Sequence, residues 1–385
     1  MRHGPPGDSP IVIVGAGLAG YGALRALRRL DQDLEISLVT EDGGAAWARP
    51  QLPSHLAAGS EASTLIQATA EVMAQRLNAS ILVDTRVVRI DRERKVLETA
   101  RGDIPYARLV LATGAAALRP SGVRGNAVER VLTLSTLADY RYFRHQLAGR
   151  HRVAILGGTV VGCEFADNLA RAGCRVSLFD SGRRLLGEQF PPLSAARLAQ
   201  GLSSAGIGVH IEDGMLRIDR AIDELVLTTL SGKQMSADVV LAASGTRPCA
   251  SIACEAGLDV GRGIRVDASL RTSDPAIFAL GECAEIAGRR FDRHEDIEAA
   301  STVLAAVLCG RPGVMSWKPR LHHLQIEACR IVMCEPPAVS GEWQETATPQ
   351  GVTALFHDLR GDLRGFVLVG DASDQAAHFF ARLGR

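Results

Sequence analysis

The sequence predicts an α/β protein in which a three-layer unit of parallel strands and helices occurs twice, followed by a small C-terminal α+β domain. A β-branched run, Ile11–Val14, ends in glycines and leads into a helical pattern and a second strand. Val153–Leu156 starts the same plan again. A buried strand, a glycine turn, a helix and another strand form the βαβ unit of a parallel sheet. Two copies in one chain are a stronger indication than either copy alone.

Each copy predicts a series of helices and strands. Short apolar runs separated by turn residues such as Ser231-Gly232 indicate strands after each βαβ start. In the first copy we expect a helix over residues 18–29 and strands over 35–40, 81–83, 87–91, 96–99 and 108–114. In the second copy we expect a helix ending at residue 172 and strands over 175–179, 209–211, 215–219, 225–229 and 238–245.

The chain after residue 245 returns to the first copy and then enters the small domain. We expect strands over 263–266 and 276–280 and an alanine-rich helix over 295–309. The tail predicts strands over 353–357 and 365–370 and a last helix over 374–383. The expected domains are residues 1–118 together with 246–315, residues 119–245, and residues 316–385.

Composition narrows the class of protein. The formal net charge is zero, which argues against nucleic acid or an anionic membrane as a partner. No apolar run reaches the roughly 18 residues of a membrane helix, and residues 1–9 are typical of a disordered tail. The eight cysteines are scattered, with no zinc spacing and therefore no expected metal. They indicate reduced thiols in a cytoplasmic protein, although Cys249/Cys254 or Cys329/Cys334 could form a redox disulfide.

The first glycine loop, Gly15–Gly20, has the spacing of a dinucleotide-binding turn. Its glycines allow a tight turn, close approach of a pyrophosphate and close packing of the helix on the strand. The phosphates would then meet free N–H groups at the helix N-terminus. Glu41 and Asp42 follow the second strand, where a ribose-binding acid is expected. The alternative is a glycine-rich turn with solvated acids.

The second loop departs from this pattern. In Gly157–Gly162, Thr159 stands where the middle glycine is expected, and a β-branched residue there would crowd a pyrophosphate and resist positive φ. Asp180 ends the next strand, as an NAD-type ribose acid would, and Arg183 and Arg184 could receive a 2′-phosphate. The sequence thus predicts NAD(P)H binding, with a retained fold of impaired affinity as the alternative.

Further motifs extend the pattern to a known family. Both loops, Ala112–Gly114, Gly245–Pro248 and Leu280–Ala284 occur in the order found in pyridine-nucleotide-dependent flavoprotein reductases, over roughly residues 10–310. Within that family the chain most resembles rubredoxin–NAD(+) reductases and flavorubredoxin reductases. That closer resemblance is carried by Tyr21, the run 47–50, the run 162–166 and the short tail. It implies that FAD receives a hydride from NADH and that single electrons pass to rubredoxin or a similar small iron–sulfur carrier.

The region that carries redox cysteines in related disulfide reductases has none here. The stretch from Arg49 to Ala58 contains no cysteine, and the chain has no Cys-x-x-Cys. Electrons that reach a flavin must therefore leave directly, to an external acceptor or to oxygen.

The resemblance also places residues at the two nucleotides. It puts Arg49 and Glu164 beside the flavin ring, where an ion pair between them would help to orient the nicotinamide; a purely structural salt bridge is the alternative. Residues expected to contact FAD or NADH are Gly15, Ala16, Gly17, Leu18, Ala19, Gly20, Glu41, Asp42, Arg49, Pro50, Val87, Ala112, Thr113, Gly114, Gly157, Gly158, Val160, Val161, Gly162, Glu164, Asp180, Gly245, Gly281, Glu282, His294 and Gln325.

Several residues depart from the family pattern. Glu282 stands in place of an aspartate, Gln325 in place of a lysine, and Asp296 lies in a usually apolar helix start. With Thr159 these changes leave two alternatives open: an FAD-binding oxidoreductase with weak or lost NADH use and another partner, or a non-catalytic scaffold. A basic cluster could receive an acidic rubredoxin or be a solvated loop; it consists of Arg289, Arg290, Arg293, Lys318 and Arg320.

Overall fold

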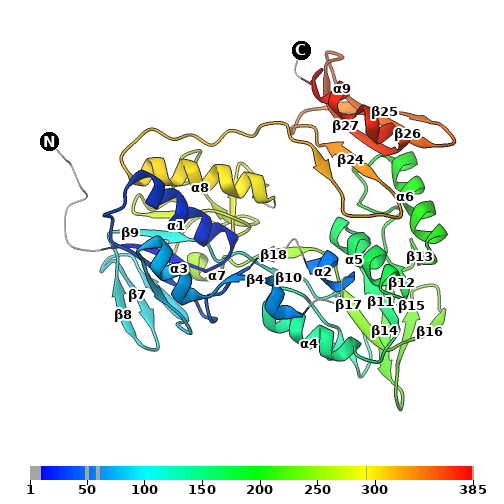
Figure 1. The fold of residues 1–385 in the computed structure, drawn as a ribbon, viewed down its shortest axis with the longest axis horizontal. Helices are drawn as coiled ribbons and strands as arrows, with labels where there is room; N and C mark the ends of the chain where they lie inside the picture. Colours follow the sequence, from blue (N-terminus) through cyan, green and yellow to red (C-terminus); the bar gives the residue numbers. More distant parts are fainter. Residues whose placement is uncertain (1–9, 48–51, 58–60, 292, 384–385) are drawn as a thin grey trace. The chain divides into compact units, whose positions relative to one another are not determined.

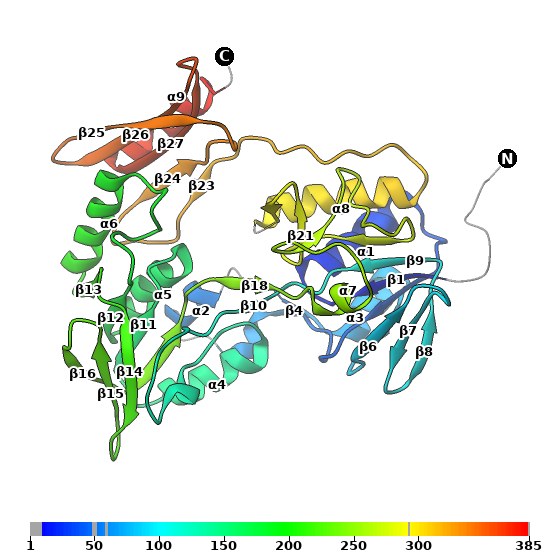
Figure 2. The same cartoon turned by 180° about the vertical axis from the view of Figure 1, so that it is seen from behind.

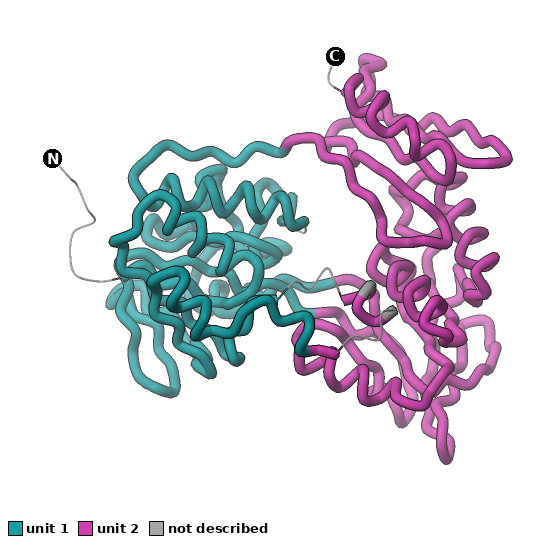
Figure 3. Tube along the Cα trace, in the orientation of Figure 1, with its two compact units in different colours: residues 1–48, 63–116, 246–317 teal, residues 49–62, 117–245, 318–385 magenta. Residues whose placement is uncertain are grey.

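A computed structural model describes residues 10–47, 52–57, 61–291 and 293–383. The chain divides into two compact units, shown in different colours in Figure 3. Unit 1 contains residues up to 48, 63–116 and 246–317, and unit 2 contains 49–62, 117–245 and 318–385. Each unit is described by itself.

Unit 1 is built on a five-stranded parallel sheet (Figure 1). Its central strand is buried along its whole length, as expected where both faces of a parallel sheet are covered. Helices α1 (Leu18–Leu30) and α8 (His294–Leu308) pack together, and an antiparallel sheet shares the same hydrophobic core. In sheet order the parallel strands are β20 (Ile277–Ala279), β9 (Arg108–Leu111), β1 (Ile11–Val14), β2 (Ile36–Val39) and β5 (Ser80–Leu82). The antiparallel strands are β6 (Val87–Asp91), β7 (Val96–Thr99) and β8 (Gly102–Pro105).

Unit 2 contains the second copy, with a four-stranded parallel sheet and a three-stranded antiparallel sheet. The parallel strands are, in order, β13 (Gly208–His210), β12 (Arg175–Phe179), β11 (Arg152–Leu156) and β17 (Val239–Ala242). The antiparallel strands are β14 (Met215–Arg220), β15 (Leu225–Thr229) and β16 (Gln234–Ala237). The helices are α4 (Leu137–Leu147), α5 (Val160–Arg171) and α6 (Pro192–Ser204).

The C-terminal part of unit 2 is a five-stranded antiparallel sheet, and α6 packs against it (Figure 2). Its strands are, in order, β23 (His322–His323), β24 (Ile331–Cys334), β27 (Leu363–Gly370), β26 (Gly351–Asp358) and β25 (Gly341–Ala347). The single helix predicted over 374–383 is wrong: a 3₁₀ turn, η4 (Asp371–Gln375), precedes a short helix, α9 (Ala376–Phe380). The Ser373 hydroxyl donates to the Gly370 carbonyl, and such local bonds compete with an α-helix.

The other elements are short. They are β3 (Ala46–Trp47), α2 (Leu52–Ala57), η2 (Ala62–Leu65), β4 (Ile66–Ala68), α3 (Ala70–Leu77), β10 (Ala115–Ala117), η3 (Val128–Arg130), β18 (Thr246–Pro248), α7 (Ser251–Glu255), β19 (Ile264–Arg265), β21 (Ala284–Ile286) and β22 (Arg289–Arg290).

In both copies, the glycine after the first strand lies close to the backbone carbonyl at the end of a neighbouring strand. Gly15 follows β1 with φ +112°, and a β-carbon there would stand 2.3 Å from the Ala112 carbonyl oxygen. Gly157 follows β11 with φ +121°, and its β-carbon would stand 2.5 Å from the Ala243 oxygen. A side chain is excluded at both positions by the neighbouring strand end as well as by φ.

Replacing Gly15 with alanine should destabilise the protein more than backbone strain alone does. Gly102 has a similar φ, +117°, but its β-carbon would meet no described atom within 4 Å. We expect Gly102→Ala to lower the free energy of unfolding by about 1–3 kcal/mol, the usual cost of an unfavourable φ. Gly15→Ala should cost clearly more, because the Ala112 carbonyl must also move. Thermal denaturation of both variants checks this, and equal losses of Tm would contradict it.

Candidate functional site

The first glycine loop leaves an open helix N-terminus at the carboxyl edge of the unit 1 sheet. Gly17 is the N-cap of α1, and no described side chain caps this helix. A β-carbon on Gly17 would meet no described atom within 4 Å, so its surface is not covered by the rest of the unit. First-turn N–H groups beside open space fit a dinucleotide pyrophosphate. Ala16 and Ala19 are buried in the turn, and Leu18 is half-buried.

The two acids after β2 have different environments. The Asp42 carboxylate accepts hydrogen bonds from the Thr40 hydroxyl, at 2.8 Å, and from the Gly44 N–H, at 2.9 Å. It therefore holds a local turn. Glu41 is exposed, and its only described ion pair is a long contact of 3.9 Å with Arg86. Glu41 is thus the acid whose oxygens are more available to a ribose.

Three predicted segments meet near the start of α1. Gly281 has φ +80°, and a β-carbon there would lie 2.6 Å from the Ala19 side chain. The Cys283 thiol, two residues later, donates to the Leu111 carbonyl at 3.4 Å, at the end of β9. Thr113 then donates to the Cys249 carbonyl at 2.6 Å. The structure therefore brings the Gly15–Gly20 loop, the Ala112–Gly114 segment and the Gly281–Glu282 segment together.

Two other predicted FAD contacts lie in regular elements of unit 1. Val87 begins β6 and is half-buried against the core. His294 begins α8, and its Nε2 lies 3.3 Å from the Glu298 carboxylate one turn along. Asp296, in the same first turn, is buried.

The second loop has the same backbone as the first despite its threonine. Thr159 has φ −76° and ψ 171°, against −77° and −170° for Gly17. The expectation that Thr159 must resist a positive φ is therefore wrong, because the position is extended. The Thr159 hydroxyl accepts from the Gly162 N–H at 3.1 Å and donates to the Ala243 carbonyl at 2.8 Å. It is an N-cap that occupies one donor of the helix terminus.

Asp180 lies against the same loop. One carboxylate oxygen accepts from the Gly158 N–H and the other from the Gly182 N–H. Of the two nearby arginines, Arg184 contacts Glu188 and the Phe190 carbonyl, both at 3.3 Å. A carboxylate held at the end of this strand suits a ribose diol and disfavours a 2′-phosphate.

Helix α5 carries two acids that bind backbone groups of the C-terminal segment. Glu164 Oε1 accepts from the Gln325 N–H at 3.0 Å, and burial raises the pKa of the Glu164 carboxyl. Asp167, one turn later and 1% exposed, accepts from the Glu327 N–H at 2.9 Å and the Ala328 N–H at 3.1 Å. The structure thus brings Glu164 and Gln325 together through the backbone of Gln325, whose side chain is exposed.

Asp167 was not predicted as a functional residue. A signal was present, since it is a charge inside the otherwise mostly apolar run 165–169. It also lies three residues after Glu164, and residues at that spacing share a helix face.

Arg49 and Pro50 lie outside the described residues, so an Arg49–Glu164 ion pair stays a prediction. Helix α2, which follows them, packs against α5 within unit 2.

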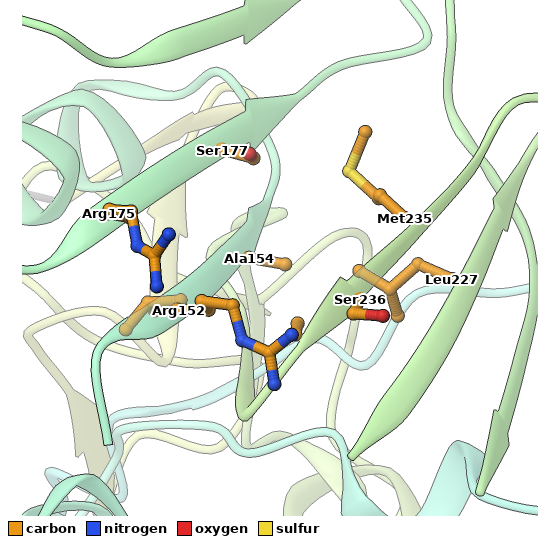
Figure 4. A pocket seen from close by; sticks show the side chains of 9 residues that line it. Arg152, Ala154, Arg175, Ser177, Leu227, Met235 and Ser236 are labelled. Atoms are coloured by element: carbon orange, nitrogen blue, oxygen red, sulfur yellow. The ribbon is translucent and has the colours of Figure 1, made fainter. Parts of the chain in front are cut away.

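Unit 2 also contains a cavity, whose lining residues are shown in Figure 4. It is a partly open cavity with a volume of about 190 Å³, and it is lined by Arg152 and Arg175, the first residues of β11 and β12, and by residues of β15 and β16. Arg152 binds the carboxylates of Asp238, at 2.5 Å, and Glu224, at 2.9 Å. Because the cavity is at the amino ends of the parallel strands, it is not part of the nucleotide site at their carboxyl ends.

The cysteines of this chain are free thiols. Burial raises the pKa of several of them, to about 11 for Cys329. Within the described ranges no group of metal-binding side chains was found. None of the helices in those ranges combines the length and apolar character needed to cross a membrane.

Comparison with known families identifies the class of protein. A family model described as pyridine nucleotide-disulphide oxidoreductase matches residues 9–307, and one described as rubredoxin binding C-terminal domain matches residues 326–383. The chain belongs to the pyridine nucleotide-disulphide oxidoreductase family. This confirms the predicted resemblance, the α/β fold class and an oxidoreductase activity, and it supports FAD as cofactor with NADH as substrate.

Individual relatives match over nearly the whole chain. The rubredoxin-NAD(+) reductase of Alcanivorax borkumensis is 36% identical, over 94% of this chain and 95% of the relative. The nitric oxide reductase FlRd-NAD(+) reductase of Vibrio vulnificus is 32% identical, over 96% of both. The crystal structure of a ferredoxin reductase from Rhodopseudomonas palustris has a TM-score of 0.86 and 26% identity, covering 96% of this chain and 93% of that one.

Removing the Thr159 cap should strengthen NADH binding. In Thr159→Gly the Gly162 N–H is freed for the pyrophosphate, while a Thr-to-Gly change at an N-cap costs only a few tenths of a kcal/mol. We expect KM for NADH to fall about 3- to 10-fold, the equivalent of about one hydrogen bond. Steady-state kinetics measure this, with Thr159→Ser as the control that keeps the cap. An unchanged or higher KM in the glycine variant would contradict it.

The raised pKa of Glu164 predicts a pH-dependent effect of Glu164→Gln. A folded-state pKa above the unfolded value means that the native carboxyl group binds more protons, so the wild type loses stability as pH rises through that interval. Glutamine still accepts from Gln325 and carries no charge. We expect Tm of the variant minus Tm of the wild type to be more positive at pH 8 than at pH 5. A difference that becomes more negative would instead indicate a cation beside the carboxylate, such as Arg49.

Proposed function

We propose that this protein takes a hydride from NADH onto FAD and passes electrons one at a time to rubredoxin or a similar small iron–sulfur carrier. The observation that carries the proposal is the order of three parts in one chain. The first part is a glycine loop with an open helix N-terminus, and the second is a glycine loop with a carboxylate, Asp180, placed to bind a ribose. The third is a C-terminal segment that matches the family model of a rubredoxin-binding domain. The relatives that share this order over nearly their full length are named as reductases of this kind.

The first copy would hold FAD. The Gly15–Gly20 loop would bind its pyrophosphate through backbone N–H groups and Glu41 its adenosine ribose. Bound FAD supplies the conversion from two-electron hydride acceptance to one-electron release. We propose the remaining FAD contacts for Asp42, Pro50, Val87, the Ala112–Gly114 segment, Gly245, Gly281, Glu282, His294 and Gln325.

The second copy would bind NADH. The loop Gly157–Gly162 would hold the pyrophosphate, and Asp180 would accept from the ribose hydroxyls. Arg49 and Glu164 would orient the nicotinamide, since hydride transfer depends chiefly on the position of the reacting atoms. These roles accompany the proposed division into an FAD domain (1–118 and 246–315), an NADH domain (119–245) and a C-terminal domain (316–385).

The charges of the C-terminal domain bear on how an acidic carrier would approach. Residues 326–383 contain eight Asp or Glu and four Lys or Arg, so this segment alone would repel an acidic protein. The proposed steering charges therefore lie outside it. In unit 1 Arg289 stacks over the Trp317 ring at 4.0 Å, and Arg290 donates to the Thr246 carbonyl. We propose these arginines as steering residues, together with Arg293, Lys318 and Arg320, in a cytoplasmic protein.

A second candidate is favoured by one observation. Because Thr159 occupies a donor of the NADH loop, the protein could retain FAD and use NADH weakly, with another electron donor.

Anaerobic reduction separates the two candidates. We expect purified protein to be yellow, NADH to bleach its 450 nm band within seconds, and added rubredoxin to be reduced in turn. The proposal fails if NADH leaves the flavin oxidised while dithionite bleaches it. Protein that remains colourless after incubation with FAD would favour a non-catalytic scaffold.

A further inference from the structure

Acids on the NADH domain bind the start of the acceptor-binding segment. Asp167 on α5 accepts the N–H groups of Glu327 and Ala328, and Glu164 accepts that of Gln325. The rubredoxin-binding match begins at residue 326, within this same stretch. The two carboxylates therefore hold four residues of backbone against a single helix face.

A reciprocal contact runs from the C-terminal domain to α6. Glu345 on β25 accepts from the N–H groups of Leu193 and Ser194, each at 2.9 Å, and from the Ser194 hydroxyl. It thereby caps a helix whose own N-cap residue is a proline. Further along α6, a β-carbon on Gly201 would stand 2.8 Å from the Ala328 carbonyl oxygen, so helix and segment are in close contact.

From these contacts we propose that Asp167 is a positioning residue for electron delivery. It fixes the acceptor-binding domain to α5, the helix whose first turn carries the NADH loop. It thereby sets the affinity of that domain for the electron carrier. The inference rests on the proposed function. The described hydrogen bonds of the Asp167 carboxylate go to the Glu327–Ala328 backbone, so its effect is exerted through that backbone.

The carboxylate is suited to this task because it satisfies two backbone donors at once. An alanine would leave both N–H groups without their partner, and an asparagine side-chain oxygen would retain at most one good acceptor contact in this geometry. The strength of the attachment should therefore decrease from aspartate to asparagine to alanine.

The experiment compares wild type, Asp167→Asn and Asp167→Ala. The matched control is Asp213→Asn, because Asp213 is also a buried acid of unit 2 that binds a backbone N–H, that of Ser231, but within its own domain. Three quantities are measured on the FAD-loaded full chain: the anaerobic rate of flavin reduction by NADH, KM and kcat for rubredoxin, and hydrogen exchange of residues 325–334.

We expect the Asp167 variants to keep the rate of flavin reduction within twofold of wild type. KM for rubredoxin should rise at least tenfold in Asp167→Ala and less in Asp167→Asn, with faster exchange at Glu327 and Ala328. The control should leave the exchange of this segment and KM for rubredoxin unchanged. An unchanged KM despite faster exchange would overturn the proposal, as would equal losses in flavin reduction and rubredoxin reduction.

Failure of the proposed function gives a different result. Wild-type protein that reduces ferricyanide with NADH but not rubredoxin would overturn that function. Hydrogen exchange would then still decide whether Asp167 fixes the domain, since unchanged protection of residues 325–334 in Asp167→Ala would overturn that part as well.

Discussion

The approach of each glycine loop to the neighbouring strand end is the contact on which both proposed nucleotide sites depend. Gly15 lies against the Ala112 carbonyl and Gly157 against the Ala243 carbonyl, too close for any β-carbon. The contact fixes where the strand stops and where the following helix starts. The helix N-terminus then lies at the carboxyl edge of its parallel sheet, where dinucleotides bind in folds of this class. The same steric constraint occurs in both copies and thus positions both of the helix N-termini that we propose as pyrophosphate sites.

The two proposed sites differ in how many of their backbone N–H groups are already hydrogen-bonded to side chains of the protein. At the first loop no described side chain caps the N-terminus of α1, and Glu41 is largely exposed. The second loop caps α5 through Thr159 and binds both oxygens of Asp180 to backbone N–H groups. A ligand entering the second site must compete with these internal bonds. That difference suits a resident cofactor in the first copy and a substrate that must leave in the second, because a site that is already partly satisfied gains less on binding.

The sequence predicted the parts of the fold that depend on local pattern. β1, β6, β7, β12 and β15 have the bounds expected from apolar runs and turn residues. The expectation for Thr159 is wrong because the N-cap position of this loop is extended in both copies, with Gly17 and with Thr159 alike, so a β-branched residue fits it. The role of Asp167 was missed because its partners are backbone N–H groups 160 residues away. Backbone donors carry no signature in the residue type, so such contacts are seen only in the folded chain.

The carboxylate contacts between the proposed NADH domain and the proposed C-terminal domain gain importance because the chain lacks a redox cysteine pair. Where a disulfide reductase stores electrons in a cysteine pair, residues 49–58 contain no cysteine. Electrons on a flavin must then leave directly, and where the acceptor is a one-electron carrier protein, that carrier has to be held in a suitable position at each transfer. A binding domain attached only by its linker would hold that carrier loosely. The carboxylates of α5 bind three backbone N–H groups of the C-terminal segment, and Glu345 binds the first N–H groups of α6. These contacts are the structural basis for the proposal that the domain is held in one place within unit 2.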